Sequence, residues 1–431
     1  MKVKRKLLKP RGKVQRFFRM SYLISPSRWL LLGAVVLVVL VITSTMASAG
    51  PQGATPWAVI KCKFSDQPQE PAFDPSFVTG TNGMAGYWQD VSYGQINLNG
   101  TTVYGWYTLP YTSAQLTNRS QRINACIDAA QTHGVNISQY YSVIAIINQQ
   151  VDSGSIGGHV LLDPAAWHVT FAGHEMGHCY NLDHSFDDTG VVYDSGSDSR
   201  PGAYGDGWDI MSAENFGRSN PTFVGPYGNS GPGLNAPNLE KLGWLTANRV
   251  WTWNRNTSQT VSLAALNHPE AGGYFMAKVP YDANNPNHYY TVEFRRKTGW
   301  DAGIPQDTVL IHEVRPDGLS YLVRTNGGAQ RLPNQTFHDV QNNVAITVLS
   351  IDSASSTAVV NIGKDDVWVD FAWQGSENGS FSLPFNTLAE GINAVRNGGT
   401  THIKAGSRNE PITINKPVTL QAYGGSATIG Q

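Results

Sequence analysis

The sequence predicts an α+β domain with a mixed twisted sheet at residues 50–247, followed by an all-β sandwich at 248–364 and a short strand-rich segment at 365–431. In the first region, apolar runs typical of buried strands alternate with helical spacings of three and four. From about residue 248, short strands separated by turns follow one another. About 380 residues remain after an N-terminal leader, more than one hydrophobic core usually holds, so two or three domains are expected.

The leader, residues 1–49, has the pattern of a signal peptide. Residues 1–28 contain ten Lys or Arg and no acidic residue, and residues 29–42 form an apolar run. That run is short for a membrane span but suits a signal-peptide core, and the Ala-Ser-Ala at 47–49 is a small-x-small cleavage site. An uncleaved anchor is the alternative, because the uncharged stretch continues beyond that site. We therefore expect a secreted protein, or a membrane-anchored one with its folded part outside.

Charge becomes strongly acidic once the leader is set aside. The whole chain has 31 basic and 32 acidic residues, and the leader holds ten of the basic ones and none of the acidic ones. The remainder therefore carries 21 basic and 32 acidic residues, a net charge of −11. Such a surface repels phosphate backbones, so nucleic acid is excluded as a partner. Contact with a membrane is expected only if the leader stays attached.

The elements of the α+β domain follow from apolar spacing and capping residues. Apolar residues recur at intervals of three and four after Asn118, which predicts a helix that Asn118 caps. Asp163 is the expected cap of a later helix, with Pro164 in its first turn. The expected elements are a strand at 56–64, a helix at 84–91, a strand pair at 96–106, a helix at 118–133, strands at 141–148 and 157–162, and helices at 165–180 and 238–244.

Residues 174–184, HEMGHCYNLDH, carry the strongest functional pattern. His174 and His178 lie four apart on one helix face, with Glu175 beside the first. His184 can reach the same point only if the helix ends near residue 180 and the chain reverses. Asn181 stands at that reversal, and asparagine readily adopts the left-handed conformation that ends helices. An ordinary amphipathic helix could contain the first two histidines, but the third makes this alternative much rarer.

This pattern, HExxHxxNxxH, resembles the metzincin zinc-peptidase signature HExxHxxGxxH, with Asn181 in place of glycine. Metzincins also carry a methionine turn beneath the metal, and the Asp-Ile-Met-Ser at 209–212 resembles one. Its Met211 follows His184 by 27 residues. The Tyr-Gly-Asp at 204–206 and the later Asn-Ala-Pro and Leu-Gly-Trp are most similar to the gametolysin-like peptidases of this clan.

The resemblance implies a zinc endopeptidase. Three neutral imidazoles would hold one Zn²⁺ and leave a fourth position for water, and Glu175 would take the proton of that water and deliver it to the departing amine. In metzincins the strand before the zinc helix borders the cleft, so Gly157, Gly158, His159 and Val160 are the predicted edge to which an extended polypeptide substrate adds. His159 is expected to line that edge and not to bind metal.

Some metzincins place a tyrosine two residues after the methionine, to support the oxyanion. This chain has Ala213 there, and Tyr193 and Tyr204 are the possible substitutes.

The loop between His184 and Met211 has two interpretations. It is rich in Asp, Gly and Ser, and clustered carboxylates on a flexible loop suit Ca²⁺. Solvated turns that use Asp for local hydrogen bonds are the alternative. The aspartates are Asp187, Asp188, Asp194, Asp198, Asp206 and Asp209.

Cys62, Cys126 and Cys179 leave an odd thiol in an oxidising compartment, so one disulfide and one free thiol are expected, with the pairing open. Cys179 is expected to pack inside the helix, because the three histidines already account for the metal.

Strand patterns dominate the rest of the chain, and no catalytic or metal cluster is expected there. Glu293 and the Arg-Arg-Lys run at 295–297 are expected to end a strand in solvent. The predicted strands are 250–253, 260–266, 274–279, 289–295, 308–314, 319–324, 345–351 and 358–362.

The last segment resembles the opening coils of a right-handed parallel β-helix. A helix at 386–395 precedes very short strands at 400–404, 412–415, 418–422 and 427–429. So few coils leave an uncovered edge, so either the chain continues or a partner, for example at the cell surface, covers it.

Two functions are therefore open. One is a secreted zinc-dependent endopeptidase that acts on extracellular or cell-wall proteins. The other is a cell-surface adhesion protein in which the peptidase-like domain is a spacer. The combination of three histidines, Glu175 and Met211 favours the enzyme, because a spacer does not need it.

Overall fold

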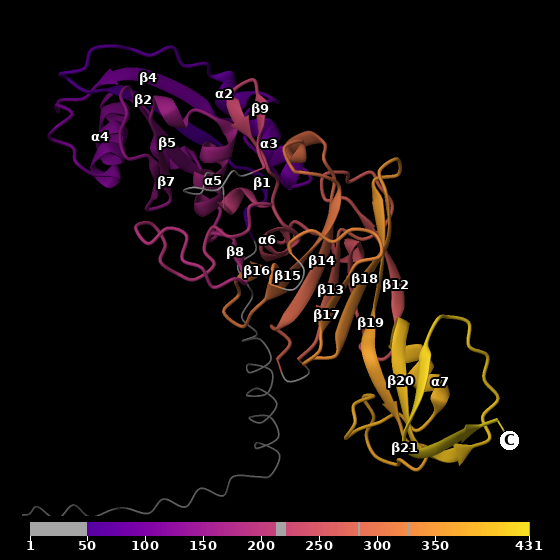
Figure 1. Cartoon of the computed structure of the whole chain (residues 1–431). Helices are drawn as coiled ribbons and strands as arrows, with labels where there is room; N and C mark the ends of the chain where they lie inside the picture. Colours follow the sequence, from indigo (N-terminus) through magenta and orange to yellow (C-terminus); the bar gives the residue numbers. More distant parts are fainter. Residues whose placement is uncertain (1–49, 213–220, 283–284, 326–327, 431) are drawn as a thin grey trace, which may run out of the picture. The chain divides into compact units, whose positions relative to one another are not determined.

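The computed structural model describes residues 50–212, 221–282, 285–325 and 328–430. These residues form a mixed α/β protein with several sheets and few helices (Figure 1). Among them, no helix is both long and apolar enough to cross a membrane. The predicted signal peptide, its anchor alternative and Ala213 lie outside the described residues.

The N-terminal region is built on a five-stranded sheet with the order β4-β2-β5-β7-β6 (Figure 1). Four of these strands are parallel, and β6 is antiparallel to β7. All six residues of β5 are buried, as the unbroken apolar run predicts. The strands are β2 (Trp57–Lys63), β4 (Thr102–Thr108), β5 (Ser142–Ile147), β6 (Gly154–Ile156) and β7 (His159–Leu162).

Helices cover both faces of this sheet. Side chains alternate along a strand, so Ala58 and Ile60 of β2 pack with α4 (Arg119–Thr132) in one core. Trp57 of the same strand packs in a second core with α3 (Met84–Val91) and α5 (Val169–Cys179). The predicted helix at 84–91 is confirmed, and so is the cap of α4, where the Asn118 side chain accepts from Gln121 N at 3.0 Å.

Short elements complete this region. β1 (Gly53–Ala54) pairs with β3 (Ile96–Asn97), whereas β4 pairs with β2, so the strand pair predicted at 96–106 is wrong. The remaining elements are α2 (Ser76–Thr79), η1 (Ile137–Gln139), η2 (Pro164–Ala166), β8 (Phe186–Asp187), η3 (Ile210–Ser212), β9 (Phe223–Gly225), β10 (Gly228–Ser230), α6 (Ala236–Lys241) and η4 (Ala247–Arg249).

The start of α5 differs from the prediction. Asp163 caps the short 3-10 helix η2, where its side chain accepts from Ala165 N and Ala166 N. The chain then bends, and His168 caps a separate helix that begins at Val169. An aspartate followed by proline marks the first helical turn, but nothing local shows that the turn is interrupted after three residues.

All three cysteines are free thiols, which corrects the expected disulfide. Cys62 of β2 and Cys126 of α4 are buried in one apolar core. Burial raises the pKa of the Cys62 thiol, and the neighbouring Cys126 thiol raises it further. Cys179 lies at the end of α5, where burial raises the pKa of its thiol to about 12.

The next region contains two six-stranded sheets that share one apolar core. One sheet has the order β11-β13-β14-β15-β16-β8, and the other has β17-β18-β19-β20-β21, with β12 on β19. Two sheets across one core are what a sandwich requires. The strands are β11 (Val250–Thr252), β12 (Gln259–Ala264), β13 (Met276–Pro280), β14 (Tyr289–Arg295), β15 (Thr308–Val314), β16 (Ser320–Leu322), β17 (Thr336–Asp339), β18 (Val344–Asp352) and β19 (Thr357–Val369), with η5 (Gly299–Asp301) between β14 and β15.

Two predicted domain boundaries run through continuous structure. β8 lies just after His184 in the chain, yet it pairs in parallel with β16, so one sheet spans the boundary at 247/248. β19 is a single strand across the boundary at 364/365. The sheets therefore connect regions that composition separates.

The prediction that Glu293 and the run at 295–297 end a strand in solvent is wrong for Glu293 and Arg295, whereas Lys297 is exposed just after β14 as expected. β14 lies between β13 and β15, and the side chains of Glu293 and Arg295 are 0% exposed. Arg295 pairs with Asp301 and Glu293, which lie close to it in the chain. Glu293 also accepts from Ala236 N and faces His312, contacts that local patterning does not reveal.

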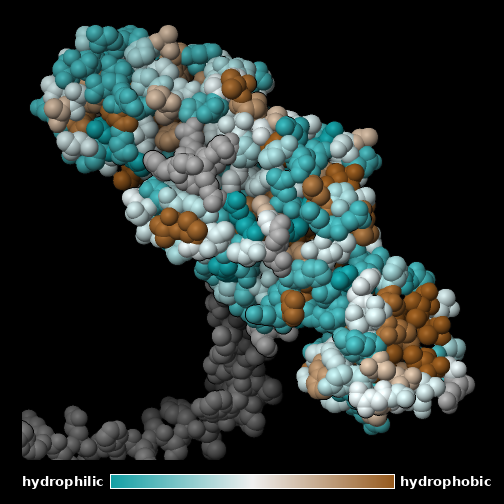
Figure 2. Space-filling model, in the orientation of Figure 1, coloured by the Kyte–Doolittle hydropathy of each residue, from teal (hydrophilic) through white to brown (hydrophobic). Residues whose placement is uncertain are grey.

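The C-terminal strands β19, β20 (Val395–Arg408) and β21 (Thr419–Ile429) pair in parallel in that order, with α7 (Leu388–Ala394) before β20. The predicted strands at 418–422 and 427–429 merge into β21, and 412–415 is not a strand. Hydrophobic side chains gather at the surface of this segment, where Leu420 is 40% exposed (Figure 2). The β-helix resemblance stays a prediction.

Candidate metal centre

The structure brings the three predicted histidines together. The ligand-type nitrogens of His174, His178 and His184 all lie within 4.8 Å of one another. His174 and His178 are one turn apart on α5, and their Nε2 atoms are 3.1 Å apart. The His184 ring centre lies 4.9 Å from that of His178 and 5.5 Å from that of His174.

The predicted reversal at Asn181 is confirmed. Asn181 has a φ of +70°, in the left-handed region. α5 ends at Cys179, and the next turn is closed by a hydrogen bond from Leu182 N to Gly177 O of 3.0 Å. The chain therefore returns along the helix end, and His184 reaches the other two rings.

Each ring has an acceptor at its outer nitrogen. His174 Nδ1 lies 3.0 Å from Ile210 O, and His178 Nδ1 lies 2.9 Å from Leu182 O. His184 Nδ1 lies 2.6 Å from Asp198 Oδ2. A proton on each Nδ1 satisfies these acceptors, so the lone pair on each Nε2 is left for a ligand.

Burial favours the neutral rings that a metal requires. Burial lowers the pKa of His174 well below its usual value, and the neighbouring histidines lower it further. Burial also lowers the pKa of His184, although the hydrogen bond to Asp198 opposes this shift.

These nitrogens fit a small tetrahedral metal ion. Two nitrogens bound tetrahedrally to zinc at 2.0–2.1 Å are about 3.3 Å apart, close to the observed Nε2 separation. The described residues hold one other group of ligand type, Asp183, His184 and Asp198, and it shares His184 with the first. The chemistry of the donor set therefore fits a single metal at the three imidazoles.

Met211 lies in η3, directly against α5. Its side chain is 0% exposed, and a Cβ added at Gly177 would stand 2.4 Å from its Sδ. Gly177 therefore permits the close approach of the sulfur to α5, one residue before His178. The same turn presents the Ile210 carbonyl to His174, so it acts on the site in two ways.

Glu175 is close to the histidines but outside the ligand group. Its Oε2 accepts from Ser155 N on β6 at 2.6 Å. Glu175 and the three histidines all line a cavity of about 670 Å³, together with Ser155 and Tyr204. A carboxylate in this position can exchange protons with a molecule in the cavity.

The predicted substrate-binding edge needs correction. Gly157 and Gly158 have φ of +60° and +80° and form the two-residue turn of a hairpin. His159 and Val160 belong to β7, which lies between β5 and β6, so β6 is the edge strand. His159 Nδ1 lies 2.9 Å from Ser142 Oγ, away from the metal ligands. Because Ile156 pairs with His159 across the turn, Ser155 N points outward, toward Glu175.

Tyr204 is the one of the two tyrosines that lines the cavity. Its ring centre is 4.0 Å from that of His184, and its hydroxyl lies 2.8 Å from Ser197 Oγ. Tyr193 instead donates to Asp187 Oδ2 at 2.6 Å. Sequence reasoning could not choose between them, because both lie in the same loop.

The aspartates of this loop bind protein donors. Asp187 accepts from Thr189 and Tyr193, and Asp188 accepts from Thr325. Asp206 and Asp209 bind donors in the buried interior. Within the described residues these carboxylates form no ligand group apart from Asp198 with Asp183 and His184, so nothing there supports the predicted calcium.

Comparisons with known proteins leave the family open. No family model matches the chain, and no curated protein matches it. Two solved structures, both of wild-type OgpA from Akkermansia muciniphila in different crystal forms, are similar at 10% and 9% sequence identity. The matches cover 65% and 64% of this chain and 96% and 92% of the other, each with a TM-score of 0.29. A similarity of this size carries no conclusion about fold or function.

Proposed function

We propose that this protein is a zinc-dependent endopeptidase of the metzincin type. One observation carries the proposal: three imidazole nitrogens converge beside a carboxylate that is not a ligand, and all four groups line one cavity. The signal-peptide pattern supports action outside the cell, on extracellular or cell-wall proteins.

The chain's own residues suit peptide hydrolysis. Bound zinc would polarise the substrate carbonyl and lower the pKa of a water molecule. Glu175 takes a proton from that water and passes it to the leaving amine. Ser155 N holds the carboxylate in place at 2.6 Å, and Tyr204 is the hydroxyl-bearing side chain next to the ligands in the cavity.

The edge of β6 supports a polypeptide as the substrate class. β6 pairs on one side with β7, and its other side borders the cavity through Ser155. An extended peptide can bind along such an edge, with main-chain hydrogen bonds for affinity and side-chain pockets for specificity.

Glu175→Gln tests the proposal. It removes the base but none of the ligands, so zinc content should stay at one ion per chain while turnover of a peptide library falls by about 10² to 10³. Zinc is measured on the purified protein and cleavage by mass spectrometry, with chelated wild-type protein as the control. Undiminished cleavage by the variant would reject the role of Glu175.

A second function, adhesion through the C-terminal strands, is favoured by one observation. β21 pairs on one side with β20, and its first eight residues are all exposed, with no charged residue among them. Adhesion would persist in Glu175→Gln, so binding of that variant to cell-wall material separates the two functions.

A further inference from the structure

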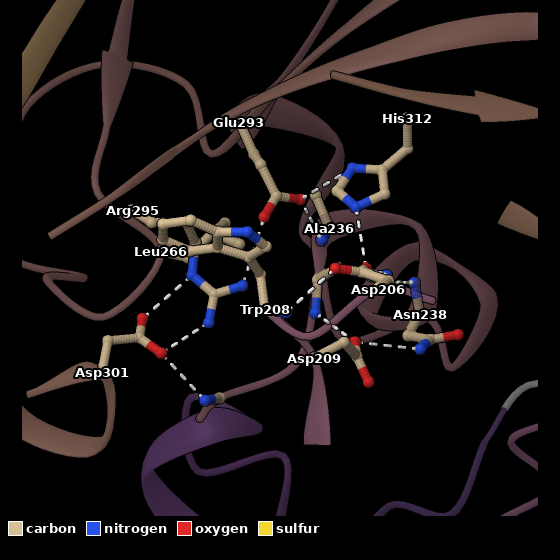
Figure 3. Close-up of polar contacts among 12 residues, drawn as sticks. Asp206, Trp208, Asp209, Ala236, Asn238, Leu266, Glu293, Arg295, Asp301 and His312 are labelled. Atoms are coloured by element: carbon tan, nitrogen blue, oxygen red, sulfur yellow. Dashed lines mark hydrogen bonds and ion pairs between the residues drawn. The ribbon is translucent and has the colours of Figure 1, made fainter. Parts of the chain in front are cut away.

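A buried polar network connects strands β14 and β15 with the segment at 206–209 (Figure 3). His312 on β15, Glu293 and Arg295 on β14, and Asp206 and Asp209 before η3 are all 0% exposed. Burying this many charges is expensive unless each one is paired and hydrogen-bonded. The hydrogen bonds among these residues are therefore specific, and they extend to the turn at 209–212 that contains Met211.

The first step runs from His312 to the turn. His312 Nε2 lies 3.0 Å from Asp206 Oδ2, and the same oxygen accepts from Asn235 Nδ2 at 3.0 Å. Asn235 N donates to Asp209 Oδ2 at 2.6 Å, and Met211 N donates to Asp209 Oδ1 at 2.6 Å. An unbroken chain of hydrogen bonds thus connects a sandwich strand with Met211.

The second step runs from the turn to the ligands. Ile210 O accepts from His174 Nδ1, and the Met211 side chain packs on Gly177 beside His178. Ser212 Oγ donates to Ser185 O at 2.8 Å, and Asn238 Nδ2 donates to Ser185 Oγ at 3.1 Å. Ser185 follows His184 directly, so the turn contacts the chain at or next to all three ligands.

His312 stands at the far end of this network, between two carboxylates. Glu293 Oε2 and Asp206 Oδ2 face its two ring nitrogens at 3.7 and 3.0 Å. Asp209 is also near His312, and Arg295 is near Glu293. Burial lowers the pKa of His312, but the nearby carboxylates of Glu293 and Asp206 outweigh it and raise the pKa above its usual value. Arg295 pairs with Asp301 and also donates to Glu293 Oε1 at 3.3 Å, and Glu293 Oε2 accepts from Ala236 N at 2.6 Å.

We infer that His312 is a positioning residue of the metal site, which acts through Asp206 on the methionine turn. The inference rests on the proposed zinc function and deepens it, because a residue of the strand-rich region then helps to position the histidines. Without a donor at position 312, the buried Asp206 carboxylate keeps only its hydrogen bonds from Asn235 Nδ2 and Trp208 N. The turn then loses part of the support that aligns His174 and the segment after His184.

His312→Leu and His312→Gln in the full chain test this inference. Leucine removes the donor, whereas the glutamine amide can still donate to Asp206. We expect zinc affinity, measured by chelator competition, to fall about 10- to 100-fold in His312→Leu and to be restored to within about threefold of wild type in His312→Gln. The visible spectrum of the Co²⁺-substituted protein should change in His312→Leu and match wild type in His312→Gln.

Tyr290→Phe is the matched control. Tyr290 lies on the neighbouring strand β14 and donates to Asp339 Oδ2 at 2.8 Å, so the variant also loses one hydrogen bond, a partly buried one without a connection to η3. Its zinc affinity and cobalt spectrum should equal those of wild type.

The outcomes separate the inference from the function. A folded His312→Leu that binds zinc as wild type does overturns the role of His312 alone. Where His312→Leu does not fold, Asp206→Asn takes its place: at least a tenfold loss of affinity supports the inference, and wild-type affinity overturns it. Wild-type protein that neither binds zinc nor cleaves peptides rejects the proposed function itself.

Discussion

Asp198 sets the orientation of His184. Its Oδ2 accepts from His184 Nδ1 at 2.6 Å, and Arg200 joins it to Asp183 through hydrogen bonds to both carboxylates. The pKa of Asp198 is lowered by the hydrogen bonds of Arg200 and His184, which outweigh the effect of burial. The carboxylate therefore stays charged and keeps the proton of His184 on Nδ1, which leaves Nε2 for a metal.

Asp198→Ala should lower zinc affinity by about 10- to 100-fold, because loss of a carboxylate behind a histidine ligand typically costs that much. Chelator competition measures the affinity. Asp194→Ala is the control, since the Asp194 side chain accepts from Gly196 N within its own turn. Equal affinities in the two variants would contradict the role of Asp198.

Asn181 makes the reversal possible through its backbone. Asn181→Gly should keep full zinc content, because glycine adopts a φ of +70° without strain. Asn181→Val should lower stability by about 1–2 kcal/mol and reduce zinc content, since a branched side chain is strained there. Thermal unfolding and metal analysis check both. A valine variant as stable and as metal-loaded as the glycine one would refute this account.

The histidine cluster could be predicted because its geometry is local. Spacings of four and six residues, with an asparagine between, fix where His174, His178 and His184 can meet. Asp198 was predicted for turns or calcium instead, because its partner His184 lies across a loop whose path the sequence does not encode. Local patterning does not single out His312, because strands bury it and its partner Asp206 lies 106 residues away.

At the scale of elements, the β6–β7 hairpin supplies the edge of the cavity. Two consecutive glycines with positive φ are the usual signal of such a turn, and the prediction of one strand from 157 to 162 overlooked it. Buried strands such as β5 were predictable from their unbroken runs of apolar residues. Sheet order was not, because the pairings of β8 with β16 and of β1 with β3 are contacts between segments that are distant in the chain.

Ser155→Pro tests the contribution of β6. Proline lacks the N–H that donates to Glu175 Oε2, and a hydrogen bond to a charged group is worth about 1.5–3 kcal/mol, so kcat/KM should fall by roughly 10- to 100-fold. Ser155→Ala keeps the N–H and should behave as wild type. Peptide cleavage and zinc content are measured together. An equal loss in both variants would assign the effect to the side chain instead.

At the scale of the whole molecule, several contacts connect the α/β region to the sandwich. β8 extends the sandwich sheet, Gly233 N donates to Asp301 Oδ1 at 2.9 Å, and Trp300 Nε1 donates to Asp90 Oδ2 on α3 at 2.9 Å. Gly233 O in turn accepts from Ile210 N at 3.2 Å, so the Arg295–Asp301 pair also reaches the methionine turn. Composition separates the two regions, but buried charged residues of one region contact the other.

Arg295→Leu should therefore destabilise both regions at once. Its loss leaves Asp301 and Glu293 buried without their cation, and breaking a buried pair in this way costs about 3–5 kcal/mol. If the two cores unfold together, calorimetry should show one unfolding transition for both. Its midpoint should fall by roughly 5–10 °C in Arg295→Leu. The midpoint should fall much less in Tyr290→Phe. Two resolved transitions, with a downward shift confined to one of them, would show that the regions are energetically independent and that the shared network is a passive contact.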